Sequence, residues 1–597
     1  MSKNSRRLSA IPLKQSSVTG GFWMGRMEVN RTAIIPAEYK QCKETGRLDV
    51  WSWKPGMPKE PHIFWDSDVA KWIEAVAYAH CEYPDPEAEA HVDEYVESMR
   101  KGQAPDGYCN SHFLLVEPEM RWTDLRNCHE LYCAGHFIEA AVAYHQATGK
   151  DALLNIMLRY IDCIAAKFGR GEGQIRGVPG HQEIELALVR LYHHTHDPKH
   201  LELAKYFVDE RGASPHYWDV EFEAWKARGG YRGWAWAPEY SQSEMPAREL
   251  SVVKGHAVRA MYFYSAMADV ASETSPPDAA LLDACDRLWD DLTRHKLYIT
   301  GGLGSSRANE GFTDPYDLPN ETAYSETCAA IGLVFWAQRM LAIKPDRRYA
   351  DLIEIALYNA ILSGVSLDGV KFFYDNPLAS AGNHMRQEWF GCSCCPTNVG
   401  RLLGALPQYI ANTSDDGIWI HQYIASRVQT AIDGVAIAVS QETDYPRSPA
   451  IRIAINPDKP VRFTLRLRIP AWADAQCVKA VLANRELDSS CVKREPNGYL
   501  AITDEWRPGD ALNLTLPLTV RYVHARPEVG YDAGRAVLMR GPIVYCIEEN
   551  DNGKNLACVR LPQEVSAWRE CETNLPEHKI FEHFALLETD EIGRAHV

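Results

Sequence analysis

The sequence predicts a multidomain α+β protein, with a ring of helices first and one or more β-sandwich domains after it. From about residue 60 to residue 410, apolar residues recur at the spacing of amphipathic helices. After about residue 412 they alternate with polar residues, as in strands with one buried face. A chain of 597 residues is also too long for one hydrophobic core. The expected parts are a helical catalytic domain over 1–412, a β-sandwich over 413–524 and a second small β-rich module over 525–597.

The helical part contains a loose internal repeat. Five segments with helical periodicity are each expected to begin just after a polar residue, and most are followed by a turn and a second helix. Hairpins that repeat five or six times close into a double ring, in which the inner helices pack together and the outer helices cover them. The polar residues would then meet in one central pocket, whereas in a solenoid they would be scattered over the surface. These residues are Asp66 or Asp68, His136, His181, His256 and Glu326.

The last third of the chain reads as strands. Segments 418–424, 435–439, 463–469 and 512–516 alternate in polarity, and Asp-Gly and Pro-Gly-Asp turns separate them. This pattern is typical of a β-sandwich. It contains no constellation of reactive residues, so we expect the sandwich to support the ring and to make a dimer contact.

Composition excludes several classes of partner. A net charge of −17 and a pI near 5.7 argue against nucleic acid and anionic membranes as partners. The sequence has no run of eighteen apolar residues, and no apolar segment follows the basic N-terminus, so neither a membrane span nor a secretory signal is expected. In such a chain the sixteen cysteines are expected to be reduced, which predicts a cytoplasmic protein.

A cluster of sulfur-containing residues is the most informative motif. Cys392, Cys394 and Cys395 fall within four residues, and Glu326 and Cys328 lie upstream. Neighbouring thiols in a reducing cell bind a soft metal, carry out redox chemistry or supply a nucleophile. We expect the adjacent Cys394 and Cys395 to lie in a loop or turn.

Three thiolates and a carboxylate could hold a tetrahedral Zn²⁺. The candidates are Glu326, Cys328, Cys394 and Cys395, but their spacing is not that of a zinc finger or ribbon. A set of buried, inert thiols is therefore equally compatible with the pattern.

A carboxylate, Glu310, follows the glycine-rich segment 301–304. That segment lacks the strand-turn-helix context of a dinucleotide- or phosphate-binding loop. Glu310 instead lies in the loop that leads into the predicted helix with Cys328. This position makes it a candidate functional group rather than a solvated loop residue.

Together these motifs resemble glycoside hydrolase family 127, which is typified by bacterial β-L-arabinofuranosidases. The resemblance covers roughly residues 15–550. It implies an (α/α)6 barrel followed by β-sandwich domains. The motifs that carry it are Glu310, Glu326-x-Cys328, Tyr374-Asp-Asn-Pro, Cys392-x-Cys394-Cys395-Pro, Leu131-Tyr-Cys-Ala-Gly-His136, Gly180-His181 and Gly255-His256.

The resemblance also implies a reaction, which is retaining exo-hydrolysis of β-L-arabinofuranosides with release of L-arabinose from a glycoside or small oligosaccharide. A general acid in this reaction must be protonated at the first step, so we expect burial or a nearby anion to raise the pKa of Glu310. One departure is Thr397, where the family usually has a second proline; it leaves the sugar preference open, and Cys392 receives no role. The implied roles are nucleophile for Cys394, acid/base for Glu310, Zn²⁺ ligands for Glu326, Cys328, Cys394 and Cys395, and a sugar pocket lined by His136, His181, His256 and Tyr374.

Other functions remain open at this stage. A relative in the same family would act on another furanoside or on a deoxy sugar. A structural or redox-sensing zinc protein needs the cysteines without Glu310 or the histidines, and a sugar epimerase or lyase on the same ring needs the histidines without the thiols. A homodimer is the expected assembly.

Overall fold

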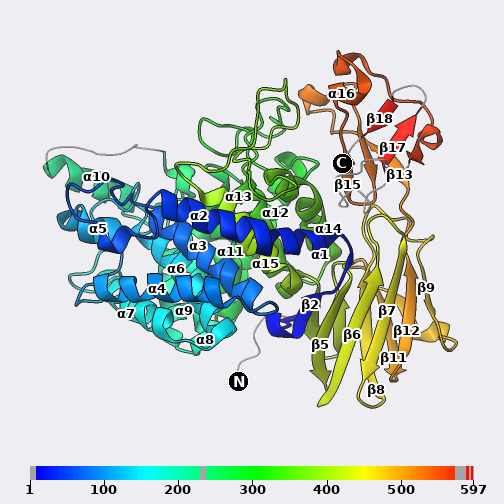
Figure 1. The fold of residues 1–597 in the computed structure, drawn as a ribbon, viewed down its shortest axis with the longest axis horizontal. Helices are drawn as coiled ribbons and strands as arrows, with labels where there is room; N and C mark the ends of the chain where they lie inside the picture. The colour runs from blue at the N-terminus through cyan, green and yellow to red at the C-terminus, as the bar shows by residue number, and fades with distance from the viewer. Residues whose placement is uncertain (1–7, 229–236, 572–585, 590–592, 596–597) are drawn as a thin grey trace.

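The computed structural model describes residues 8–228, 237–571, 586–589 and 593–595. A helical body, a β-sandwich and a smaller C-terminal part follow one another along the chain (Figure 1). The predicted α+β architecture, with helices first and sheets after them, is confirmed.

Six inner helices form a closed ring within the described residues. Each contacts the next along the chain, and the last returns to contact the first. This closure confirms the barrel and excludes the solenoid. The inner helices are α3 (Trp65–His80), α6 (Glu130–Thr148), α8 (Ile184–Thr195), α11 (Ala257–Glu273), α13 (Thr327–Ile343) and α15 (Cys394–Gly404).

An outer layer covers the ring. Five outer helices each follow and contact an inner helix: α4 (Pro86–Gly102), α7 (Ala152–Lys167), α9 (Pro198–Glu210), α12 (Ala279–His295) and α14 (Arg347–Ala356). The chain leaves the ring after α15, so the sixth outer position is filled from the N-terminal region by α2 (Ile35–Glu44), which contacts both α3 and α15. The other α-helices of the described residues are α1 (Gly21–Val29), α5 (Ser111–Leu115), α10 (Tyr217–Ala227) and α16 (Glu549–Asn552).

The two layers begin with different residues. Four outer helices start on an aspartate whose side chain accepts backbone N–H groups of the first turn: Asp85, Asp197, Asp278 and Asp346. This cap satisfies amide groups that have no partner inside the helix. Three inner helices start instead on His256, Glu326 and Ser393, all close to the predicted site. These three inner helices thus begin on residues of the candidate site, and His256 also caps its own helix through Nδ1.

Several sequence predictions about helix starts were wrong. Asp66 and Asp68 lie inside α3, which begins at Trp65, and His181 lies three residues before the start of α8 at Ile184. His136 is the seventh residue of α6, because that helix already begins at Glu130. Cys394 and Cys395 are the first two residues of α15 and do not lie in a loop. Consecutive helical residues are only about 100° apart around the axis, so two adjacent cysteines in the first turn of a helix can both face one site.

The sandwich consists of two six-stranded sheets among the described residues, and each takes an edge strand from the N-terminal region, β1 (Ser9–Ala10) or β2 (Ser16–Val18). The sequence pattern did not predict these two strands. The first sheet has the order β1, β3 (Ala411–Ser414), β4 (Gly417–Ile420), β8 (Val461–Arg468), β11 (Tyr499–Trp506) and β10 (Val492–Arg494). The second has the order β2, β5 (Ser426–Ile432), β6 (Val435–Thr443), β7 (Ala450–Pro457), β12 (Asp510–Thr515) and β9 (Lys479–Leu482).

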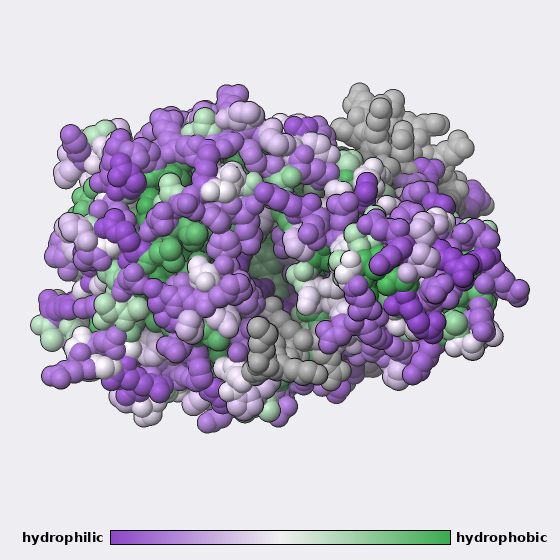
Figure 2. Space-filling view, turned by 90° about the horizontal axis from the view of Figure 1, so that it is seen from below, coloured by the Kyte–Doolittle hydropathy of each residue, from purple (hydrophilic) through white to green (hydrophobic). Residues whose placement is uncertain are grey.

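The C-terminal part holds two three-stranded sheets among the described residues. One contains β13 (Val520–Val523), β14 (Val537–Arg540) and β15 (Ile543–Tyr545), and the other contains β16 (Arg569–Cys571), β17 (Leu586–Thr589) and β18 (Gly593–Ala595). The face of the molecule in Figure 2 is mainly hydrophilic, with small hydrophobic patches between polar groups. Across the described ranges, no helix has both the length and the apolar character needed to cross a membrane.

Candidate active site

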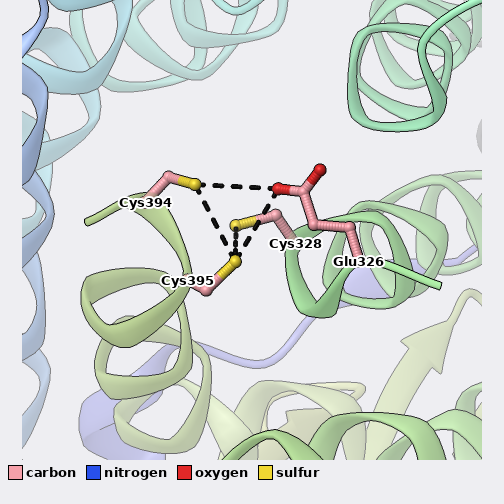
Figure 3. Close-up of side chains that lie close together, drawn as sticks. All are labelled: Glu326, Cys328, Cys394 and Cys395. Carbon is pink, nitrogen blue, oxygen red and sulfur yellow. Dashed lines mark hydrogen bonds between the residues drawn. The ribbon is translucent and has the colours of Figure 1, made fainter. Parts of the chain in front are cut away.

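The predicted sulfur cluster forms at the starts of two inner helices. Glu326 is the N-cap residue of α13 and Cys328 is its second residue, while Cys394 and Cys395 open α15. Their ligand atoms all lie within 4.8 Å of one another (Figure 3). The Cys395 Sγ is 3.4 Å from the Cys328 Sγ and 3.8 Å from the Cys394 Sγ. The Glu326 Oε1 is 3.6 Å from the Cys394 Sγ and 3.7 Å from the Cys395 Sγ.

These distances fit a tetrahedral zinc site. Zn–S bonds of about 2.3 Å and Zn–O bonds of about 2.0 Å, at tetrahedral angles, separate the ligand atoms by about 3.5–3.8 Å. The Glu326 Oε2 is buried without a hydrogen-bond partner, as expected of a carboxylate whose natural partner is a cation. The donor set of the four residues therefore fits Zn²⁺.

Burial makes a cation-free cluster unfavourable in its ionised form. Glu326, Cys328 and Cys395 are each at most 2% exposed, and Cys394 is 9% exposed. Burial, followed by the charge of Cys394, raises the pKa of Glu326 well above its usual range. Burial and the neighbouring thiols raise the pKa of Cys395 in the same way. A divalent cation would displace these protons and convert the cluster to its anionic form.

Glu310 lies beside this cluster. Its carboxylate is within 4.8 Å of the Glu326 carboxylate and accepts a hydrogen bond from the Tyr324 Oη at 3.1 Å. A β-bridge between His256 and Gly311 holds the loop that contains Glu310. A Cβ atom at position 311 would lie 1.8 Å from the Gly255 carbonyl oxygen. Only glycine fits at that position. The side chain of Glu310 is 38% exposed and so can meet a ligand.

The expected rise in the pKa of Glu310 was wrong for the ligand-free protein. Burial does raise it, but hydrogen bonds from His256 and Tyr324 and the charge of Arg259 outweigh burial and lower the pKa to about 2. The His256 Nδ1 accepts backbone N–H groups of Val258 and Arg259, which leaves the ring proton on Nε2, 3.5 Å from the Glu310 carboxylate. Burial lowers the pKa of His256, so at neutral pH this ring is a neutral donor. The free carboxyl is therefore ionised.

Tyr374 contacts the cluster, and His181 lies beside His256. Tyr374 precedes Asp375, which forms a bridge with Glu326, and its Oη is 3.3 Å from the Cys394 Sγ. The His181 ring centroid is 5.5 Å from that of His256, and its Nδ1 donates to the Gln182 carbonyl oxygen at 2.8 Å. The His181 Nε2 is then left as an acceptor.

His136 is placed differently from the other predicted pocket residues. Its side chain has no exposed surface, its ring packs edge-on against Tyr132, and its Nδ1 lies 3.0 Å from the Glu183 Oε1. In this arrangement His136 supports Tyr132 and does not face the open pocket. Its contact with a sugar stays a prediction.

Comparison with known sequences decides the family. A sequence model of the β-L-arabinofuranosidase GH127 catalytic domain matches residues 16–408. Models of the GH127 middle domain and of the family 127 C-terminal domain match residues 417–518 and 520–581. The chain belongs to glycoside hydrolase family 127.

Individual family members agree along almost the whole chain. A non-reducing end β-L-arabinofuranosidase of Bifidobacterium longum subsp. longum is 35% identical over 529 residues, which cover 84% of this chain and 78% of that protein. The crystal structure of a GH127 β-L-arabinofuranosidase from Geobacillus stearothermophilus T6 is similar with a TM-score of 0.89 at 42% identity, covering 96% of this chain and 91% of the other. A further GH127 β-arabinofuranosidase structure has a TM-score of 0.87 at 34% identity and covers 99% and 95% of the two chains. The protein is thus a glycoside hydrolase.

Several residues of this family 127 site were not singled out in the sequence. Tyr132 lies between the rings of His136 and His181, with centroid distances of 4.5 and 4.4 Å. Tyr324 stands two residues before Glu326, and Arg401 lies two turns into α15. Tyr132 and Tyr324 are direct neighbours of motifs already identified, so proximity in sequence was an available signal. Arg401 had none, because its partners lie on other helices.

Proposed function

We propose that the protein is a retaining exo-β-L-arabinofuranosidase that releases L-arabinose from the non-reducing end of small glycosides. Cys394 acts as the nucleophile and Glu310 as the acid/base. The observation that carries this proposal is the juxtaposition of a Glu–Cys–Cys–Cys cluster with a separate, half-exposed glutamate. The substrate class comes from the β-L-arabinofuranosidases that are similar over most of the chain.

Cys394 is the best-placed nucleophile among the three cysteines of the cluster. It is 9% exposed, against 2% for Cys328 and 0% for Cys395. It also occupies the first position of α15, where the unpaired N–H groups of the helix favour a thiolate. The Tyr374 hydroxyl, 3.3 Å away, can donate to that thiolate.

Glu326, Cys328, Cys394 and Cys395 would hold the zinc ion. When bound, zinc keeps the coordinating thiols deprotonated at neutral pH and fixes their direction. The Cys394 thiolate then attacks the anomeric carbon while Glu310 gives a proton to the leaving oxygen, which breaks the glycosidic bond and forms a thioglycoside on Cys394. In the second half, Glu310 takes a proton from water, the oxygen attacks the same carbon, and the carbon–sulfur bond breaks.

Glu310 must gain a proton before the first half-reaction. In the free protein its carboxylate is held ionised by the donors His256 and Tyr324. A bound sugar hydroxyl that engages His256 removes one of these donors, and exclusion of water strengthens the effect of burial. Both changes raise the pKa of Glu310 toward the range that a general acid requires.

Replacement of the nucleophile tests the proposal most directly. Cys394→Ser is expected to lower kcat on 4-nitrophenyl β-L-arabinofuranoside by about 10⁴-fold or more, the scale on which loss of a covalent nucleophile acts. Cys392→Ser is the matched control, since it changes a neighbouring thiol outside the cluster, and it should keep most activity. Near wild-type turnover by the Cys394 variant would refute the proposed mechanism.

Leaving-group dependence tests the acid/base. Glu310→Gln is expected to lose about 10²- to 10⁴-fold on an alkyl furanoside, and less on a 2,4-dinitrophenyl furanoside whose leaving group needs no proton. An equal loss on both substrates contradicts the assigned role. The first-formed product should be the β-anomer when followed by NMR, and release of the α-anomer would rule out retention.

The sugar preference, the assembly and the location in the cell are further proposals. A panel of aryl furanosides and deoxy sugars will show whether L-arabinose is preferred. The homodimer and the cytoplasmic location stay predictions, to be tested by light scattering and by fractionation of cells.

A further inference from the structure

Arg47 lies between an inner helix and the segment that leads into the cysteines. It is 2% exposed, and its Nε donates to the Asp68 Oδ2 at 2.8 Å. Its Nη2 donates to the Gly391 carbonyl oxygen at 2.8 Å. The guanidinium carbon also lies 4.7 Å from the centre of the Trp65 ring and 5.5 Å from that of Trp389. Two of these four partners lie on α3, and two lie just before Cys392.

A short, tightly bonded turn connects Gly391 to the first residue of α15. The Ser393 Oγ donates to the Phe390 carbonyl oxygen at 2.5 Å and accepts the Phe390 N–H at 3.3 Å. The Thr397 Oγ1 donates to the Ser393 carbonyl oxygen at 3.1 Å and lies 3.3 Å from that of Cys394. Ser393, two residues after Gly391 and one before Cys394, is fully buried and hydrogen-bonded on both sides.

We propose that Arg47 is a positioning residue for Cys394: by fixing Gly391 against α3, it sets the direction of the attacking sulfur. This inference rests on the proposed role of Cys394 as nucleophile. It adds a residue that lies 344 positions before its partner Gly391 and contacts none of the four cluster residues in the described structure.

The geometry requires arginine at this position. The planar guanidinium donates along two directions while its faces lie against two indole rings, whereas a lysine ammonium is a point charge without faces. Lysine therefore keeps the positive charge beside Asp68 but loses the link to Gly391. A misplacement of the reacting atom by about 1 Å can cost about 10²-fold in rate.

Arg47→Lys tests the proposal, with Arg26→Lys as the matched control. Arg26 is also 2% exposed and donates to two backbone carbonyl oxygens, of Leu367 at 2.9 Å and of Ser366 at 3.3 Å, in a different loop. For both variants kcat, KM, zinc per chain and Tm are measured on the full-length protein. We expect Arg47→Lys to lower kcat about 10- to 100-fold with KM and zinc content within about twofold, and Arg26→Lys to change Tm only.

Three results would overturn the inference. They are an unchanged kcat for Arg47→Lys, a loss of kcat that follows zinc loss, and an equal loss of kcat for Arg26→Lys. The experiment includes Cys394→Ser, so the two proposals fail separately. An active Cys394→Ser enzyme refutes the role of Cys394 as nucleophile. If Cys394→Ser is inactive while Arg47→Lys is fully active, only the positioning role of Arg47 is refuted.

Discussion

A buried arginine held by two carboxylates occurs at two places in the molecule, once inside the ring and once at the seam between ring and sandwich. In the ring, the Arg401 Nη1 lies 2.9 Å from Glu74 and 2.7 Å from Glu139. At the seam, Arg468 of β8 lies 2.5 Å from Asp351 and 2.6 Å from Glu354 of α14. Both guanidinium groups are almost completely buried, at 2% and 0% exposure.

The two places differ in what surrounds the arginine. Arg401 also binds Asn398 and Tyr262, so it joins four inner helices just below the cysteine cluster. At the pocket end, the Glu326 Oε2 is buried without a hydrogen-bond partner among the described residues. At the seam the Glu354 carboxylate also accepts hydrogen bonds from Tyr445 and Trp472. Both oxygens of the Glu354 carboxylate at the seam thus have protein donors, whereas one oxygen of the Glu326 carboxylate at the pocket end is left available for a metal.

Removal of the metal should produce the largest difference between the ring and the seam. A structural zinc site contributes on the order of 10 kcal/mol of apparent binding energy. Cys328→Ser should lower zinc affinity by more than the roughly 10- to 100-fold that loss of a supporting partner costs, and activity should fall with it. In hydrogen exchange, α13 and α15 should lose protection, while α14 and β8 should keep theirs.

Cys163→Ser, on outer helix α7, is the control for this experiment and should bind zinc normally. Equal loss of protection in the ring and the seam would show that the metal stabilises the whole molecule and that the two regions are not independent.

Removal of either arginine should cost a similar amount of stability. Arg401→Met and Arg468→Met each leave buried carboxylates unpaired, which typically costs about 3–5 kcal/mol. Urea unfolding measures that loss. Of the two variants, only Arg401→Met should lower kcat by more than the loss of folded protein explains, because it loosens the helices that carry the site. A matching loss of kcat in Arg468→Met would contradict the comparison.

Acid should weaken both regions through one buried histidine in each. Burial, followed by the charge of Arg259, lowers the pKa of His129 at the pocket to about 3. Burial and the charge of Arg468 lower the pKa of His421, which contacts Tyr499, to about 3 at the seam. The unfolded chain binds these protons near pH 6.5, so stability falls as pH drops from about 6.5 toward 3, by about 1.4 kcal/mol per pH unit and group.

Unfolding midpoints between pH 7 and 5 test this expectation. His421→Gln and His129→Gln should each remove the contribution of one histidine to the pH dependence of the unfolding free energy. A slope that neither variant changes would mean that other groups control acid sensitivity.

The smallest effects are expected from two tyrosines. Tyr374→Phe removes a hydroxyl beside Cys394, and Tyr445→Phe removes one that donates to Glu354 at 2.7 Å. A hydrogen bond to a charged group contributes about 1.5–3 kcal/mol. The first change should therefore lower kcat about 10- to 100-fold at unchanged Tm, and the second should lower stability at unchanged kcat. A reversed pattern would contradict the division of roles.

Local patterns in the sequence predict the helical domain, the sandwich and the candidate members of the cysteine cluster. Helical and strand periodicity are local properties, and a motif such as Glu326-x-Cys328 places two candidate ligands at one helix start. The resemblance to family 127 added roles for these residues, and the family itself is confirmed.

The tertiary structure decided what depends on contacts between distant parts of the chain. Four such features are the contact of α15 with α3 that closes the ring, the burial of His136, the ionised state of Glu310 and the link from Arg47 to Gly391. Periodicity and capping act over about a dozen residues, whereas burial and charge depend on which segments meet after folding. Arg47 and Gly391 are 344 positions apart, so no local pattern could have paired them.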